Sequence, residues 1–280
     1  MIRIALFVSV LTALSAPAFA QQRPLDTEDP ETIGSGRMLL EFGVDYRQDW
    51  SNPVSGLRGN LFAVPVLGMS LGVSSIAEIQ MYIGGYQNLR ITEQNPDAPF
   101  ADLLKLDGLT TDDLEDLRVG AKLRVVSETA TRPSIATWFS TRLPNAGNES
   151  GLGKDLQDFY TSVLVAKTVR STRVVGNLGL LMLGNPVQPA AQDDLLTYSL
   201  SIARALSPAA EVVGEFVGRA NFARTTTPGA EDRGMFRFGA RYTHSGVRID
   251  GGILLGLTSR DPDFGATAGL TWVFNAFNIP

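Results

Sequence analysis

Strict alternation of apolar and charged residues is the feature that most constrains what this chain can fold into. The period of two runs through residues 40–47, 117–125, 236–242 and 247–251. In one of these segments Arg118, Lys122 and Arg124 share one parity, and large apolar residues hold the other. Because successive side chains of a β-strand point to opposite faces, each segment has one apolar and one polar face. The sequence therefore predicts an all-β protein.

Extending the pattern predicts twelve strands. They lie near residues 38–48, 58–73, 77–92, 114–126, 133–143, 158–170, 173–183, 195–206, 210–222, 234–243, 246–257 and 264–275. The connections alternate in length, with the long ones near 49–57, 93–113, 144–157, 184–194, 223–233 and 258–263. In a barrel that crosses the bacterial outer membrane, periplasmic turns are short and outer loops are long. We therefore expect a transmembrane up-and-down antiparallel β-barrel of about 12 strands over residues 38–280.

The composition argues against several other classes of protein. The chain has 280 residues, of which 44% are hydrophobic and 19% charged, so it can bury enough apolar surface to fold. A formal net charge of −5 argues against a nucleic-acid partner, because binding phosphates needs a basic face. The chain has no cysteine and one histidine, which argues against zinc, iron–sulfur and most acid–base chemistry. We expect no metal, no cofactor and no catalysis.

The first twenty residues have the three parts of a secretory signal peptide. A basic start at Met1-Ile2-Arg3 precedes an apolar run over residues 4–16, and Ala18-Phe19-Ala20 supplies a small-residue cleavage site. The apolar run is too short to span a membrane as a helix. Residues 1–20 are therefore predicted to be removed on export, which leaves residues 21–37 as a periplasmic N-terminal segment ahead of the barrel.

The charged strand faces are expected to line the lumen. In an outer-membrane barrel the apolar face meets lipid, whereas in a soluble barrel it packs inward. The polar faces carry many charges, Glu78 and Arg90 among them. The predicted pore-lining residues are Arg118, Lys122, Arg124, Glu211, Glu215, Arg219, Arg237, Arg241, Arg248 and Asp250. Rings of charge can set the selectivity of a pore, but opposite charges can also pair and plug a narrow lumen. Both states stay open for a barrel of this size.

Three segments of the chain carry a family resemblance. They are residues 23–36 ahead of the first strand, residues 71–79 around a tight turn, and the closing hairpin over residues 256–274. In these segments the chain resembles the transporter-like outer-membrane barrel family named for the meta pathway of phenol degradation. The resemblance implies an outer-membrane barrel that moves small or hydrophobic molecules and has no catalytic motif. The chain departs from a common outer-membrane ending, because it runs past Phe274 to Pro280.

Two other patterns resemble chemical sites but lack the context that such sites need. Gly68-Met69-Ser70-Leu71-Gly72 matches the nucleophile elbow of hydrolases, yet Ser70 lies within a predicted strand and His244 lies in a predicted turn. An acidic cluster closes the longest loop, at Asp112, Asp113, Glu115 and Asp116. It lacks the spacing of a calcium loop, and a solvated charge run is the simpler interpretation. Residues 103–106, just before it, could form a short helix at the barrel mouth.

The leading hypothesis is a channel or transporter-like protein in the cell outer membrane for small solutes, hydrophobic ones included. Its expected partners are outer-membrane lipid and lipopolysaccharide, the barrel-assembly machinery and an unidentified small-molecule solute, with no nucleic acid. One alternative is a structural or adhesion barrel whose outer loops, residues 93–113 above all, bind a partner. Another is an outer-membrane hydrolase that uses Ser70 and His244.

Overall fold

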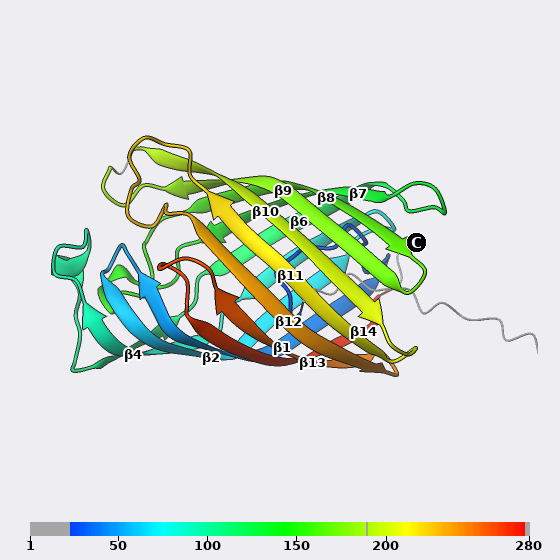
Figure 1. Ribbon diagram of the computed structural model, residues 1–280, viewed down its shortest axis with the longest axis horizontal. Helices are drawn as coiled ribbons and strands as arrows, with labels where there is room; N and C mark the ends of the chain where they lie inside the picture. The colour runs from blue at the N-terminus through cyan, green and yellow to red at the C-terminus, as the bar shows by residue number, and fades with distance from the viewer. Residues whose placement is uncertain (1–22, 189, 278–280) are drawn as a thin grey trace, which may run out of the picture.

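Fourteen β-strands form one continuous antiparallel sheet in the computed structural model, which describes residues 23–188 and 190–277 (Figure 1). The strands are β1 Arg37–Asn52, β2 Leu57–Gly72, β3 Ala77–Ile83, β4 Tyr86–Gln94, β5 Thr110–Leu114, β6 Leu117–Val126, β7 Ser134–Leu143, β8 Asp158–Val169, β9 Thr172–Gly184, β10 Gln192–Ala205, β11 Ala210–Ala220, β12 Arg233–His244, β13 Val247–Gly256 and β14 Phe264–Asn275. Two 3₁₀ turns, η1 Ala101–Leu103 and η2 Asn148–Ser150, lie in loops. The predicted signal peptide, residues 1–20, lies outside the described residues.

The sheet closes on itself as a barrel. Strand β1 pairs with β14 from Arg37–Asn275 to Gln48–Phe264, and on its other edge it pairs with β2. Strands β3 and β4 pair with successive parts of β2, and β5 and β6 pair with β4 and β3 in turn. Strands β3 and β4 together occupy one position around the wall, and β5 and β6 together occupy the next. The fourteen strands therefore fill twelve positions. The prediction of an all-β, twelve-stranded, up-and-down antiparallel barrel is confirmed.

The wall is interrupted where the third and fourth predicted strands each divide in two. Pairing between β2 and its neighbour stops after Val64–Tyr86 and resumes at Leu67–Ile83. The outward side chains change parity across this gap, because Ile83 and Tyr86 are both exposed. The polar face predicted for residues 77–92 therefore does not continue past the gap. Arg90, which the alternation placed toward the lumen, is exposed, and its neighbour Leu89 is buried.

The two ends of the barrel differ in the length of their connections. At the end that lies to the left in Figure 1, the long-loop end, strands are joined by residues 53–56, 95–109, 144–157, 185–191, 221–232 and 257–263. At the other, short-turn end the connections are residues 73–76, 127–133, 170–171, 206–209 and 245–246. The predicted long loop over 49–57 is wrong in length, because Trp50 to Asn52 still pair with β2. The other long loops agree with the sequence.

The wall has an apolar outer surface and a polar interior. Large apolar side chains that are between 44% and 59% exposed occur on most strands and include Phe42, Phe139, Leu178, Leu200, Phe238 and Ile253. Charged side chains of the same strands are buried, among them Glu78, Lys122, Asp158, Glu215, Arg248 and Asp250. This arrangement is the reverse of a soluble barrel, in which apolar residues fill the interior. The described residues contain no helix that is long and apolar enough to cross a membrane.

Small apolar clusters lie at both ends of the barrel. At the long-loop end Leu57, Leu61, Leu89 and Ile91 pack with Trp50, Leu104, Leu106 and Leu152. The loop in which residues 103–106 could form a short helix has one helical turn, η1, and Leu104 and Leu106 pack on this cluster. At the short-turn end Ile33 packs on Leu39 and Val273. Ile33 belongs to the segment that precedes β1.

Candidate functional site

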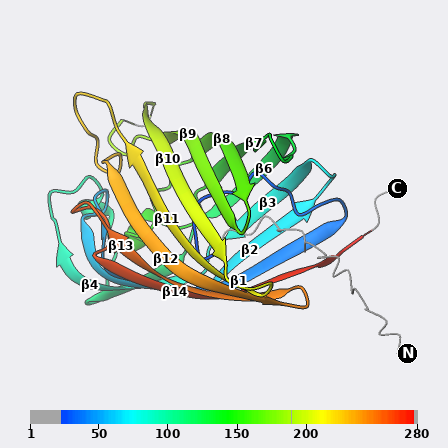
Figure 2. The same cartoon turned by 45° about the vertical axis from the view of Figure 1, so that its right-hand side comes forward.

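Residues 23–36, the inner segment, lie inside the barrel. The sequence had placed residues 21–37 in the periplasm, ahead of the barrel. Figure 2 shows the strands of the wall around the opening that this segment enters. Its residues make hydrogen bonds or ion pairs to side or main chains of nine strands: β1, β2, β3, β6, β9, β11, β12, β13 and β14. The inner segment therefore crosses the lumen from one side of the wall to the other.

A buried ion triad holds the middle of the inner segment. Lys122 of β6 is fully buried, and its Nζ lies 2.6 Å from a carboxylate oxygen of Glu28 and 2.9 Å from one of Glu78. The same Nζ donates to the main-chain carbonyl of Asp29 at 2.8 Å. The three N–H groups of the ammonium are thus all used. Such a satisfied arrangement is what allows charged groups to be buried at all.

Two further wall side chains, Glu215 and Asn177, each make two hydrogen bonds to the main chain of the inner segment. The carboxylate of Glu215 accepts hydrogen bonds from the N–H groups of Asp26 and Thr27 at 2.7 and 2.8 Å, and from the Thr27 hydroxyl at 2.6 Å. The amide of Asn177 accepts from the N–H of Glu28 and donates to its carbonyl, both at 2.8 Å. Because these hydrogen bonds are made to the main chain, they fix the path of the inner segment through the lumen, in addition to the ion pairs made by its side chains.

Ion pairs along the inner segment balance the remaining lumenal cations near it. Arg173 holds Asp29 with two hydrogen bonds of 2.6 and 2.7 Å. Arg124 pairs with Glu31, and Arg237 pairs with Asp26. At the start of the segment Arg23 is the cation instead, and it lies 3.5 Å from Asp45 and 3.6 Å from Asp250. The segment and the wall are therefore complementary in charge along their whole contact.

Several wall glycines make room for the inner segment, Gly72 and Gly43 among them. A Cβ on Gly72 would lie 1.7 Å from the carbonyl oxygen of Gly34, and the N–H of Gly36 donates to the Gly72 carbonyl at 2.9 Å. A Cβ on Gly43 would lie 2.4 Å from the guanidinium of Arg23. Gly72 needs to be a glycine because the main chain of the segment lies against it, whereas a Cβ on Gly43 would displace the Arg23 side chain.

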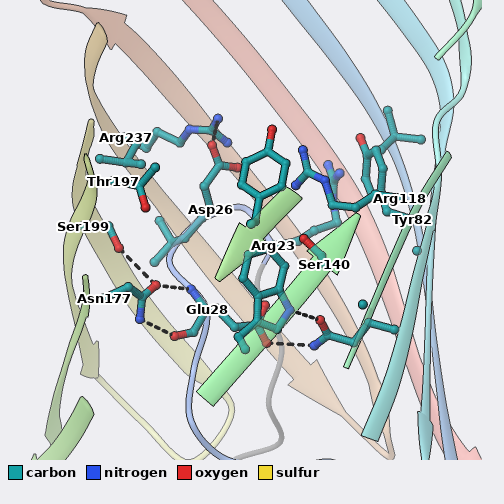
Figure 3. Close-up of a pocket in the computed structure, with 18 of the residues that line it drawn as sticks. Arg23, Asp26, Glu28, Tyr82, Arg118, Ser140, Asn177, Thr197, Ser199 and Arg237 are labelled. Carbon is teal, nitrogen blue, oxygen red and sulfur yellow. Dashed lines mark hydrogen bonds and ion pairs between the residues drawn. The ribbon is translucent and has the colours of Figure 1, made fainter. Parts of the chain in front are cut away.

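A cavity of about 490 Å³ lies beside the inner segment (Figure 3). Arg23, Asp26 and Glu28 form part of its lining, and the wall supplies the rest. Figure 3 shows Asn177 and Ser199 on one side of the segment, with Tyr82 and Arg118 across the lumen from them. The aromatic lining consists of Trp50, Tyr82, Trp138, Tyr160 and Tyr198. The cavity thus combines charged groups with apolar ring faces, as ligand pockets do.

A second cavity of about 220 Å³, the outer chamber, lies toward the long-loop end. Loop residues such as Pro53, Ala146 and Gly229 contribute to its lining. The two cavities share Arg47, Trp50, Tyr82, Glu115, Arg118, Tyr160, Arg219 and Arg233. They are therefore adjoining parts of one lumen, on the long-loop side of the inner segment.

All ten residues that the sequence proposed for the lumen have charged partners or lumenal contacts. Arg118, Arg219 and Arg237 line the larger cavity. Lys122, Arg124, Glu215, Arg237, Arg241 and Asp250 contact the inner segment. The remaining two contact wall residues: Glu211 lies 3.8 Å from Arg241, and Arg248 donates to the Thr243 hydroxyl at 3.2 Å. Their role in lining a conducting pore stays a proposal.

The residues that resembled chemical sites are not assembled into one. Ser70 is buried in β2, whereas His244 is exposed at the end of β12, four strand positions away around the wall. In the acidic cluster, Asp116 accepts from the N–H groups of Asn145 and Ala146, and Asp113 accepts from that of Gly147. These carboxylates thus bind the loop over residues 144–157. Within the described parts of the chain, no group of acidic, histidine or cysteine side chains is arranged to hold a metal ion.

Comparisons with solved structures identify the same fold elsewhere. An outer membrane channel from Pseudomonas putida F1 superposes with a TM-score of 0.62 at 13% identity, covering 89% of this chain and 100% of that one. The translocator domain of the autotransporter NalP from Neisseria meningitidis gives 0.52 at 12%, covering 85% and 88%. The KdgM porin in complex with disordered oligogalacturonate gives 0.51 at 8%, covering 84% and 99%. At these identities the likeness shows the barrel fold.

No family model matches the chain, and no curated protein matches it. The resemblance to the family named for phenol degradation is therefore supported only as far as the outer-membrane type of barrel, and the finer assignment stays a prediction.

Proposed function

We propose that this protein is a channel of the bacterial outer membrane that passes small solutes and carries out no catalysis. The closed barrel with an apolar outer surface and a charged lumen is the observation that carries this proposal. An apolar exterior suits acyl chains, and a polar interior suits an aqueous path. Residues 1–20 would direct export, the assembly machinery would insert the barrel, and lipid and lipopolysaccharide would surround it.

The inner segment determines how such a channel would work. It lies across the lumen and is bound on both sides by charged wall residues, which supports a path that is closed at the short-turn end in the resting state. Passage of a solute would then require the inner segment to shift. Because it is held by ion pairs and hydrogen bonds more than by buried apolar side chains, salt and solute charge would affect its release.

Conductance across a planar bilayer tests this proposal. We expect low conductance from the unaltered protein and a higher conductance from the Glu215→Gln variant, because Glu215 binds the main chain of Asp26 and Thr27. Glu149→Gln is the matched control, since Glu149 forms an exposed ion pair with Lys105 in the loops. It should behave as the unaltered protein.

Folding is checked by comparing gel migration with and without boiling, since compact barrels migrate faster before boiling. A folded barrel that neither conducts nor admits any small solute, in the unaltered form and in Glu215→Gln alike, would contradict the channel proposal.

A further inference from the structure

The two halves of the lumen differ in their charge balance. Four wall cations that contact or surround the inner segment have carboxylate partners: Lys122 has Glu28 and Glu78, Arg124 has Glu31, Arg173 has Asp29, and Arg237 has Asp26. The outer chamber is different. Its lining holds the cations Arg47, Arg118, Arg142, Lys154, Arg219 and Arg233 against the carboxylates Glu115 and Asp116. Cations thus outnumber carboxylates by six to two in its lining.

Three of these arginines have no carboxylate within 4.0 Å among the described residues: Arg118, Arg219 and Arg233. Arg118 lies over the ring of Tyr160, 4.9 Å from its centroid. Arg219 donates only to the main-chain carbonyls of Glu231 and Gly229, at 2.9 and 2.8 Å. Arg233 donates to the carbonyl of Ser51 at 3.3 Å. The buried Nε atoms of Arg118 and Arg233 make no hydrogen bond within the described chain. These guanidinium groups retain donors that an acceptor in the chamber could use.

Lys154, in the loop over residues 144–157, adds to the positive charge of the outer chamber. Its Nζ lies 3.4 Å from Asp158, which also pairs with Arg142, while Arg142 lies 3.7 Å from Asp116 as well. Burial and the nearby cations Arg142, Arg219 and Arg233 lower the pKa of Lys154 to about 7, against the opposing effect of Asp116. A positive charge is therefore costly at this position until an anion is present.

We propose that the outer chamber binds a small organic carboxylate, with its anionic group held by Arg118, Arg219 and Arg233. A guanidinium offers two parallel donors that match a carboxylate, which makes arginine suited to this recognition. Trp50, Tyr82 and Tyr160 line the chamber beside these arginines and provide ring faces for an apolar body. The chamber of about 220 Å³ shares lining residues with the cavity of about 490 Å³, and that adjoining cavity is within the size range of ligand sites.

This inference names the class of solute for the channel proposed above. It rests on that function only for the statement that the bound anion is the solute that the channel passes. Binding itself does not require conduction. An anion held at the long-loop end would be concentrated at the entrance, because a cationic cleft of low dielectric raises the local concentration of anions.

Calorimetric titration of the full, detergent-solubilised protein tests the inference with three probes. Benzoate has both a carboxylate and an apolar ring. Benzamide has the same shape without the charge, and inorganic phosphate has charge without an apolar ring. At low ionic strength and pH 6 we expect benzoate to bind at least tenfold more tightly than either other probe. Equal affinity for benzamide would overturn the role of the arginines. Equal affinity for phosphate would overturn the organic part of the proposal, and absence of benzoate binding would overturn it entirely.

Substitutions localise the binding. Arg118→Gln should weaken benzoate at least tenfold, and the double variant with Arg233→Gln should weaken it further. Arg224→Gln, in the exposed loop over residues 221–232, removes the same charge and should leave the affinity unchanged. If the double variant does not fold, the single variant and the comparison of probes on the unaltered protein still decide. Benzoate binding that survives Arg118→Gln in a folded barrel would overturn the assignment.

The pH dependence gives a second readout. Lys154 faces Arg142, Arg219, Arg233, Asp116 and Asp158. Since it loses its proton as pH rises through about 7, benzoate should bind more tightly at pH 6 than at pH 8.5. Lys154→Met should remove most of that difference, and a pH effect of full size in this variant would count against the chamber. Conductance that fails while benzoate binds would refute the channel alone, and the reverse result would refute the chamber alone.

Discussion

Replacing Lys122 by methionine should loosen the inner segment. The substitution leaves Glu28 and Glu78 buried without the ammonium that now lies 2.6 and 2.9 Å from them. Breaking a buried ion pair by removal of one partner costs about 3–5 kcal/mol. The wall keeps its main-chain pairing in this variant, so the least costly response is for the segment to leave and hydrate Glu28. At about 1.4 kcal/mol per factor of ten, the population with a displaced segment should rise by roughly 10²-fold or more.

Thiol labelling measures this population. The chain contains no cysteine, so Thr27→Cys supplies a single reporter at a position that is 5% exposed. We expect the labelling rate of this reporter thiol to rise by about two orders of magnitude when Lys122→Met is added. Lys105→Met is the matched control, because Lys105 pairs with Glu149 at the surface, where such a pair contributes at most about 1 kcal/mol.

The reasoning would be refuted if a folded Lys122→Met barrel labelled at the rate of the Lys105→Met control. That result would mean that the triad does not hold the inner segment in place.

Three further substitutions test other parts of the structure. Gly43→Ala should displace the Arg23 guanidinium, whose nearest atoms lie 2.4 Å from the added Cβ, and raise the labelling of the reporter thiol, whereas Gly176→Ala meets its nearest atom at 3.8 Å and should not. Arg173→Gln removes two hydrogen bonds to Asp29 and should raise the labelling about tenfold, with the exposed Arg132→Gln as control. Leu178→Arg, on the apolar outer surface, should destabilise the barrel in lipid vesicles and lower its free energy of unfolding by about 2–4 kcal/mol. Leu109→Arg, in a loop, should leave that free energy unchanged. If any of these variants had the same effect as its control, the position that the structure gives the substituted residue would be contradicted.

The period of two was sufficient to predict the wall of the barrel. Residues such as Arg118 and Lys122 alternate with apolar neighbours because one face of β6 lies inside and the other outside. The same rule places Glu215 and Asp250 on the inner face, where both contact the inner segment. Strand pairing between neighbours in sequence then left one simple topology, which the structure has.

The contents of the lumen could not be predicted in the same way. The inner segment has no regular secondary structure, so it has no period to detect, and its bonds join residues as distant as Thr27 and Glu215. The carboxylates between Asp26 and Glu31, seen against the cations predicted for the lumen, were the one available signal. Alternation alone does not predict the parity change beside Pro65, because it describes an unbroken ladder and the ladder stops there.

Arg23 links the first residues of the described chain to the seam of the barrel, which is the pairing of β1 with β14 that closes the sheet into a cylinder. Its guanidinium reaches Asp45 on the first strand and Thr267 on the last, and its carbonyl accepts from Arg241. The seam joins the two ends of the sheet, so it can form only after every other hairpin has been synthesised. Arg23 bridges that joint, so the inner segment can complete its contacts with both strands only once the joint has closed. The contacts of Arg23 and the pairing of β1 with β14 therefore stabilise each other, because each holds the same two strands together.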